Sequence, residues 1–316
     1  MLTVQPYPGY GTDGWVRVLG RVLLVPPAAA NRDAEVGQAG HRAVRGWRSF
    51  VTVQVPGARV DVHIGGSVHR VLADRGGYVD AVLPADLQPG DREVTLAVGG
   101  HRVAAAVVVI GPEPGLALLS DIDDTVMVTA LPRPLLAAWN ALVMHENARR
   151  PVDGMAGFYR RWHGSHPGSA TFYLSTGAWN VAPAVQRFLD RHGYPAGPLL
   201  LTDWGPTNTG WFRSGPEHKV QTLRRLMGEL PQLRWVLVGD DGQHDRQIYT
   251  RIAEEFDSRV VAVAVRELSP TEQLLAHGTP VPTTDGRIPR RPGGAIVLSG
   301  ADGNALALSF IDAGLL

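Results

Sequence analysis

The chain has 316 residues, of which 30 are Lys or Arg and 30 are Asp or Glu, so its formal net charge is zero. This balance argues against a nucleic-acid-binding protein, because such proteins normally carry a basic surplus. The absence of cysteine excludes disulfide bonds and thiolate metal sites, so any bound metal ion must have oxygen or imidazole ligands.

Residues 1–112 have the sequence pattern of a β-domain. Short β-branched, partly alternating segments are separated by Gly, Pro and Asp turns. The predicted strands are residues 49–55, 58–64, 92–98 and 102–110. Strands of this length and spacing are typical of a small β-sandwich. Residues 28–46 are polar and irregular and predict a loop, and GPEPG at Gly111–Gly115 predicts the domain boundary.

Residues 113–316 alternate apolar strands with helical patterns. The predicted strands are residues 116–120, 171–175, 199–202, 234–239 and 260–265. The predicted helices are Leu135–Asn147, a helix capped by Asn180 and stopped by Gly193, a helix from Lys219, and Ile248–Phe256. This alternation predicts an α/β fold with a doubly wound parallel sheet. Beyond Leu268 we expect a tail rich in Pro, Gly and Arg that ends in a short apolar segment.

No apolar run in the sequence approaches the roughly 18 residues that a membrane-spanning helix needs. The apolar stretch near the N-terminus is interrupted by Arg17 and Arg21, which favours a first strand over a signal peptide. We therefore expect a cytoplasmic protein.

Three carboxylates follow the first strand of the second domain: Asp121, Asp123 and Asp124. Like charges this close raise each other's pKa unless a cation or protons relieve them. Magnesium favours such hard oxygen ligands, so a metal site is one interpretation. The alternative is an acidic turn that caps a helix.

Two other predicted strand ends carry polar groups. Ser175, Thr176 and Gly177 follow one strand and offer hydroxyls and backbone N–H groups to phosphoryl oxygens, although ordinary helix capping would use the same residues. The other strand is followed by the acidic residues Asp240, Asp241 and Asp245. This second cluster suits a metal ligand, and its alternative is a capped, solvated turn.

Lys219 is the only lysine of the chain. A coding bias against lysine codons explains the excess of arginine. An ammonium is a compact point charge and a guanidinium is a planar fork, so a site that needs a point charge does not accept Arg. At a predicted helix start a cation is also unfavourable against the helix dipole, which predicts an anionic partner. The alternative is a solvated surface lysine.

The order of these groups resembles the haloacid dehalogenase-like superfamily: an acidic pair, a hydroxyl, a lysine and a second acidic cluster. Asp121–Thr125 (DIDDT) fits its DxDxT motif, and Gly239–Asp245 fits its GDxxxxD motif. The resemblance implies a haloacid dehalogenase-like phosphatase domain in the second part of the chain.

Within that superfamily the chain resembles the actin-patch-type phosphatidate phosphatases and their bacterial relatives, which typically have a small β-rich domain before the catalytic domain. The similar segments are Gly9–Leu23, Trp179–Asn180, His218–Met227 and Val238–Tyr249. Two positions differ from the family. Asp241 stands where serine is common, and Ser175–Trp179 reads STGAW where SNSPW is closer to the pattern. These differences concern lipid specificity and leave the implied catalytic roles intact.

The resemblance implies that Asp121 attacks phosphorus to form an aspartyl-phosphate and that Asp123 is the general acid and base. It also implies a Mg²⁺ site. Its ligands would be the carboxylates of Asp121 and Asp240, the backbone carbonyl of Asp123, and Asp245, with Asp241, directly or through water.

The resemblance further implies how the substrate is held. Ser175 would hydrogen-bond the phosphoryl group, with Thr176 as its substitute and Gly177 contributing backbone. Lys219 would balance the charge of Asp121 and of the phosphoryl oxygens.

The segment between Thr125 and Asp153 is modest in size, so we expect no large lid, and an open site suits bulky substrates such as lipids at a membrane surface. Aromatic residues with Arg are favoured at membrane interfaces, and arginine pairs attract anionic lipid. The candidates for peripheral membrane contact are Trp139, Trp204, Trp211, Phe212 and Arg213, and the pairs at residues 149–150, 160–161 and 290–291. The alternatives are aromatics that cover the sheet and arginines on solvated faces.

Three functions are consistent with the sequence. The first is a phosphatase for a lipid phosphomonoester, with phosphatidate as the leading substrate. The second is a phosphatase for a soluble phosphorylated metabolite, and the third is a non-catalytic module that binds a membrane or a protein. The set of Asp121, Asp123, Ser175, Lys219 and Asp240 argues against the third. The sequence does not determine the oligomeric state.

Overall fold

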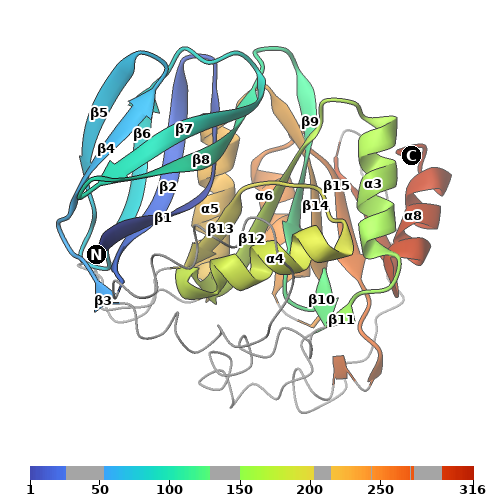
Figure 1. The fold of residues 1–316 in the computed structure, drawn as a ribbon. Helices are drawn as coiled ribbons and strands as arrows, with labels where there is room; N and C mark the ends of the chain where they lie inside the picture. Colours follow the sequence, from blue (N-terminus) through green and yellow to red (C-terminus); the bar gives the residue numbers. More distant parts are fainter. Residues whose placement is uncertain (26–52, 129–149, 203–214, 243, 271, 274–293) are drawn as a thin grey trace. The chain divides into compact units, whose positions relative to one another are not determined.

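The computed structural model describes residues 1–25, 53–128, 150–202, 215–242, 244–270, 272–273 and 294–316 (Figure 1). Two compact units make up the chain, Met1–Pro112 and Glu113–Leu316. Within the described residues, no helix is long and apolar enough to cross a membrane.

The first unit contains one eight-stranded sheet. Its strands are β1 (Leu2–Thr12), β2 (Trp15–Leu24), β3 (Val53–Gln54), β4 (Arg59–Ile64), β5 (Ser67–Leu72), β6 (Tyr78–Pro84), β7 (Gly90–Val98) and β8 (His101–Ile110). They are ordered β3-β2-β1-β8-β7-β4-β5, and β6 also pairs with β2. The three strands predicted at residues 58–64, 92–98 and 102–110 are confirmed as β4, β7 and β8. The predicted loop at residues 28–46 lies outside the described residues.

A single curled sheet replaces the two-sheet sandwich that the sequence predicts. β5 ends the strand order and β6 pairs with β2 near the other end, yet β5 and β6 contact each other, so the sheet bends around its core. The long strand β1 assists this bend, since its pairing with β2 shifts register between Tyr7 and Tyr10. Alternate residues of β4, namely Val60, Val62 and Ile64, point into an aliphatic core. Alternation reveals which residues face the core, whereas the pairing partners are set by contacts distant in sequence.

The second unit is a mixed α/β structure built on a six-stranded parallel sheet. Its strands are β9 (Gly115–Asp121), β12 (Ala170–Ala178), β13 (Leu199–Thr202), β14 (Leu233–Asp240), β15 (Val260–Arg266) and β16 (Ile296–Gly300). The order is β13-β12-β9-β14-β15-β16. After β9 the chain adds β12 and β13 on one side and then β14, β15 and β16 on the other, so the strand order reverses between β9 and β14. Ligands of parallel α/β sheets bind at the carboxyl ends of the strands beside such a reversal. A small separate pair consists of β10 (Met127–Val128) and β11 (Arg150–Pro151).

The helices of the described part of this unit are α3 (Met155–Ser165), α4 (Ala182–His192), α5 (Gly215–Glu229), α6 (Asp245–Glu255) and α8 (Gly303–Asp312). α5 packs with α6, and α3 packs with α8 (Figure 1). The five predicted strands of this unit are confirmed, as is the end of α4 at Gly193, whose φ of 69° is in the left-handed region. The predicted helix Leu135–Asn147 lies outside the described residues.

Three local predictions were wrong. Asn180 does not cap α4, because it lies in a 3-10 turn, Trp179–Val181, that runs directly into the helix. Lys219 lies inside α5 and not at its start. The C-terminal tail contributes both β16, which pairs with β15, and α8, whose Phe310 packs on Phe158 of α3.

Candidate active site

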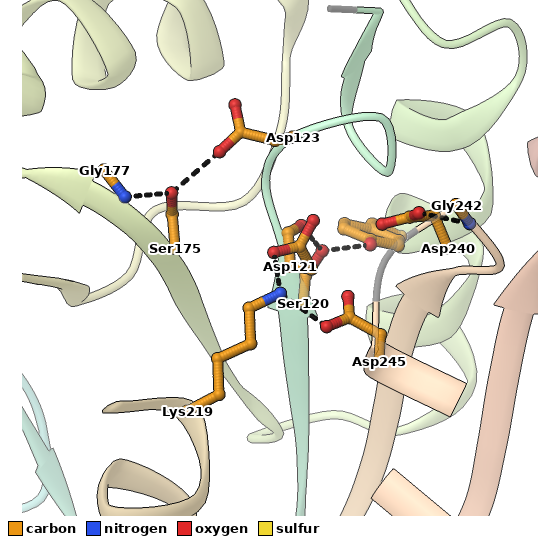
Figure 2. Close-up of polar contacts among 10 residues, drawn as sticks. Ser120, Asp121, Asp123, Ser175, Gly177, Lys219, Asp240, Gly242 and Asp245 are labelled. Carbon is orange, nitrogen blue, oxygen red and sulfur yellow. Dashed lines mark hydrogen bonds and ion pairs between the residues drawn. The ribbon is translucent and has the colours of Figure 1, made fainter. Parts of the chain in front are cut away.

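The carboxyl ends of β9, β12 and β14 bring the predicted site residues together (Figure 2). Asp121 ends β9, Ser175 lies near the end of β12, and Asp240 ends β14. The sheet register places Leu174 opposite Asp121 on one side of β9. β9 and β14 are apolar strands in the centre of the sheet. The carboxylates at their carboxyl ends are therefore buried.

Lys219 binds two buried carboxylates. Its Nζ lies 2.6 Å from Asp121 Oδ1 and 2.5 Å from Asp245 Oδ1, and all three side chains are at most 2% exposed. Burial alone would lower the pKa of Lys219, but the negative charges of Asp121, Asp245 and Asp240 raise it above its usual value. The ammonium therefore stays charged at neutral pH, and the predicted anionic partner of Lys219 is present.

The Oδ2 atoms of Asp121, Asp240 and Asp245 are buried and have no hydrogen-bond partner among the described residues. These three residues can offer one oxygen each within 4.8 Å of one another. Burial, reinforced by the neighbouring carboxylates, raises the pKa of Asp121 and of Asp240 well above the usual range. An unpaired buried carboxylate is costly, and a cation relieves that cost. These three residues could therefore hold a metal ion with oxygen ligands.

Gly239 makes room for this cluster. A Cβ on that residue would lie 2.6 Å from Asp245 Oδ2 and 2.8 Å from a ring carbon of Tyr249. Both contacts are with buried groups on α6, so a larger residue would displace the Asp245 carboxylate. The glycine of the GDxxxxD motif is thus required by close packing.

Asp240, the last residue of β14, and Asp241, which follows it, have different surroundings. Asp240 is fully buried, and its Oδ1 accepts a hydrogen bond from the backbone N–H of Gly242 at 2.7 Å. Asp241 is partly exposed, and its Oδ1 accepts the backbone N–H of Leu268 at 2.8 Å. Asp241 is not among the three residues that surround the unpartnered oxygens, so its contact supports the loop after β15.

Lys219, Asp121 and Asp245 are referred to below as the lysine cluster. Asp123 and Ser175 form a second polar pair beside this cluster (Figure 2). Ser175 Oγ donates to Asp123 Oδ2 at 2.8 Å and accepts the backbone N–H of Gly177 at 2.9 Å. The hydroxyl predicted to bind a phosphoryl group is therefore directed at Asp123 in this structure. Thr202, which the sequence analysis did not select, supports this turn because its hydroxyl bonds the backbone carbonyls of Thr176 and Gly177 at 2.8 and 3.1 Å.

Sequence reasoning missed the groups that support the backbone of Asp121. Ser120 Oγ donates to the Asp121 carbonyl at 2.6 Å and lies 2.5 Å from the hydroxyl of Tyr159 on α3. Because Ser120 donates its only hydroxyl proton to the Asp121 carbonyl, the Tyr159 hydroxyl is the donor in its contact with Ser120. Both side chains are fully buried. The serine in the apolar segment LALLS was the sole sequence signal, and nothing in the sequence pointed to Tyr159.

Most residues proposed for membrane contact lie outside the described part of the chain. These are Trp139, Trp204, Trp211, Phe212, Arg213, Arg149, Arg290 and Arg291, together with most of the segment expected to lack a large lid. Arg160 and Arg161 are exposed on α3, and Arg160 Nη1 donates to the carbonyl of Gly193 at 2.9 Å.

Residues 116–267 match the family described as "Phosphatidate phosphatase APP1, catalytic domain". A Saccharomyces cerevisiae protein named phosphatidate phosphatase APP1 is 26% identical over 153 residues, which cover 48% of this chain and 26% of that protein. An uncharacterised Schizosaccharomyces pombe protein is 23% identical over 156 residues, 49% of this chain and 25% of its own length. The chain thus spans about a quarter of these relatives.

Among solved structures, a carbohydrate acetylesterase from Xanthomonas citri aligns over 84% of this chain and 68% of its own, at 12% identity and a TM-score of 0.30. Similarity at that level supports no inference. The matched segment 116–267 contains every residue of the lysine cluster and of the Asp123–Ser175 pair. Over that segment the chain is similar to the family of the phosphatidate phosphatase APP1 catalytic domain.

Proposed function

We propose that this chain is a magnesium-dependent phosphatase with a haloacid dehalogenase-like, doubly wound domain. Its substrate would be a lipid phosphomonoester, with phosphatidate hydrolysed to diacylglycerol. The observation that carries the proposal is the buried Lys219, paired with Asp121 and Asp245 beside three unpartnered carboxylate oxygens. Such a charge arrangement is costly in a purely structural role and suits a site that binds a cation and a phosphoryl group.

In the first step a carboxylate oxygen of Asp121 attacks phosphorus, and the bond from phosphorus to the ester oxygen breaks. Asp123 gives its proton to the departing alkoxide, so an alcohol leaves and an aspartyl-phosphate remains. Ser175 donates to Asp123 at 2.8 Å in the structure, and its hydroxyl would turn toward a phosphoryl oxygen when the substrate binds. The backbone N–H groups at Thr176 and Gly177 are candidates for further phosphoryl contacts.

In the second step water attacks the phosphorus of the aspartyl-phosphate. Asp123, now ionised, accepts a proton from that water, and the bond from phosphorus to Asp121 breaks to release inorganic phosphate. Lys219 remains protonated throughout, since its pKa is raised, and balances the charge of Asp121. A Mg²⁺ ion held by Asp121, Asp240 and Asp245, with the backbone carbonyl of Asp123, would add positive charge next to the phosphoryl oxygens.

The lipid assignment rests on the similarity of residues 116–267 to the phosphatidate phosphatase APP1 catalytic domain and on the activity for which the yeast relative is named. We assign residues 113–316 as the phosphatase domain and residues 1–112 as a β-domain without an assigned role. We also propose that the protein is cytoplasmic with peripheral membrane contact. Flotation with strongly anionic liposomes tests that contact, and an absence of binding would contradict it.

The deciding experiment measures magnesium-dependent phosphate release from phosphatidate in mixed micelles, beside a panel of soluble phosphomonoesters. Asp121→Asn is the control. Release from phosphatidate that vanishes in the variant is the expected result. Release from soluble esters alone would retain the mechanism and reject the lipid substrate. No release from any ester would reject the phosphatase proposal and favour a binding module.

A further inference from the structure

A buried arginine at the end of β15 is bonded to the loop that carries Asp123. Arg266 is 5% exposed, and the sheet register places it opposite Asp240. Its Nη1 donates to the backbone carbonyl of Asp124 at 2.7 Å, across 142 residues of sequence. The other guanidinium nitrogens donate to Glu272 Oε1 at 2.6 Å and to the Ala301 carbonyl at 3.3 Å. The mechanism above uses none of these contacts.

The backbone that Arg266 contacts has a conformation that needs support. Asp124 has a φ of 57°, in the left-handed region that non-glycine residues rarely adopt, although Asp tolerates it better than most. Its N–H donates to the carbonyl of Met127 at 2.8 Å. A residue in this region persists where its surroundings fix it from several sides. Here Met127 holds the N–H and Arg266 holds the carbonyl, directly after Asp123.

Arg266 is itself held in place. Glu272 accepts the backbone N–H of Ser269 at 2.8 Å through its second carboxylate oxygen, and Ser269 Oγ accepts the N–H of Glu272 at 3.3 Å. These reciprocal bonds are those of a capping box. Burial opposes ionisation of Glu272, yet the hydrogen bonds from Arg266 and Ser269 hold its pKa below the usual value. The guanidinium is therefore fixed by a charged partner that is itself fixed.

We propose that Arg266 is a positioning residue, which fixes the backbone of Asp124 so that the side chain of Asp123 is aligned for proton transfer to the leaving group. This inference rests on the proposed function. Arg266 touches neither the substrate nor the reacting atoms, so its removal should affect the proton-transfer role of Asp123 selectively. Alignment matters because displacements of about 1 Å can cost about a hundredfold in rate.

The leaving group distinguishes this role from a merely structural one. An alkoxide, as leaves from dioctanoyl phosphatidate, needs a proton in the first step, whereas p-nitrophenolate leaves readily without one. The ratio kcat/KM reports steps up to the first bond cleavage. We expect Arg266→Lys to lower kcat/KM about tenfold to a hundredfold for dioctanoyl phosphatidate and by less than about threefold for p-nitrophenyl phosphate. Asp123→Asn should show the same selectivity more strongly.

Arg259→Lys is the matched control. Arg259 precedes the opposite, amino end of β15 and also donates to backbone carbonyls, those of Leu233 and Leu230 at 2.9 Å each. The Arg259→Lys variant should be less stable than the wild type, but its kcat/KM should not fall more for dioctanoyl phosphatidate than for p-nitrophenyl phosphate. Glu272→Gln keeps the guanidinium and weakens its anchor, so it should show the same selectivity, to a smaller extent, even if Arg266→Lys fails to fold.

Equal losses on the two substrates, or no loss, in the Arg266 and Glu272 variants would overturn the positioning role while leaving the phosphatase proposal standing. Phosphate release from neither substrate by the wild-type protein would overturn the proposed function and, with it, this role. A selective loss in the Arg259 variant as well would also overturn the inference, because the effect would then follow from general destabilisation.

Discussion

The two compact units differ in how deeply the ion pairs of their described residues are buried. In the described part of the first unit, Arg70 pairs with Asp61 on the surface, where their side chains are 62% and 38% exposed, and the core is aliphatic. In the second unit Lys219 pairs with Asp121 and Asp245 at no more than 2% exposure. Both units contain apolar sheets, so the need for a core does not explain the difference.

Burial of charge is expensive, and replacing a buried ion pair by apolar residues is often neutral or stabilising. A cluster with unpartnered carboxylate oxygens is therefore expected where function requires it. This contrast supports placing the proposed chemistry in the second unit. It also gives the predictions for Asp121 and Lys219 a matched control variant in the first unit.

The largest expected effect is the loss of the nucleophile. Asp121→Asn should lower phosphate release by at least about a thousandfold, as removal of a nucleophile does in other enzymes that form covalent intermediates. Asp61→Asn removes a carboxylate of the first unit and should leave turnover unchanged. Phosphate release under saturating Mg²⁺ measures both. Wild-type turnover in the Asp121 variant would refute the assignment of the nucleophile.

The next effect concerns the shape of the cation. Lys219→Arg keeps the charge, but a planar fork cannot reproduce the contacts of a point ammonium with two carboxylates in a closed space. We expect kcat to fall about a hundredfold. Arg70→Lys, the reverse exchange at the exposed pair, should change neither kcat nor stability. If the Lys219 variant keeps its activity, the point charge has no catalytic importance.

The stability of the metal-free protein should depend on pH through Asp240. Its pKa is raised in the folded state above 3.8, so the folded state binds more protons than the unfolded state and stability falls as pH rises through that window. Without metal at pH 7, Asp240→Asn should therefore melt at a higher temperature than wild type, and the difference should shrink towards pH 4.

With Mg²⁺ bound, the wild type should melt at a higher temperature than Asp240→Asn. A ligand at a hundred times its Kd stabilises by about 2.7 kcal/mol, and the variant lacks one of the three carboxylates. Thermal unfolding in EDTA and in MgCl₂ measures both effects. An equal Mg²⁺ shift in the two proteins would place the metal elsewhere.

The smallest expected effect separates positioning from packing. Tyr159→Phe removes the donor to Ser120 and should cost about 1 kcal/mol of stability together with a few-fold loss in kcat. Tyr173→Phe removes a comparable hydroxyl contact, which is made to the Pro195 carbonyl at 2.7 Å and not to Ser120. It should cost similar stability at unchanged kcat. Urea unfolding and steady-state kinetics test the pair, and equal kcat values in the two variants would contradict a role for Tyr159.

Five strands of the second unit and the residue types of its site could be predicted from the sequence. Apolar runs such as LALLS and RWVLVG are local signals, and each became a strand that ends in a buried aspartate. Carboxyl ends of parallel strands share one edge of a sheet, so Asp121 and Asp240 could be expected to meet. The single lysine and its need for an anion were also visible in the sequence.

The tertiary structure alone decided which partners these groups have. The direction of the Ser175 hydroxyl toward Asp123, the contact of Tyr159 with Ser120 and that of Arg266 with Asp124 join residues 39 to 142 positions apart. The same is true of the curled first sheet and of β16 with α8, whose segments carry weak local patterns. A sequence pattern reports the preferences of neighbouring residues, whereas these contacts depend on which distant surfaces exclude water together.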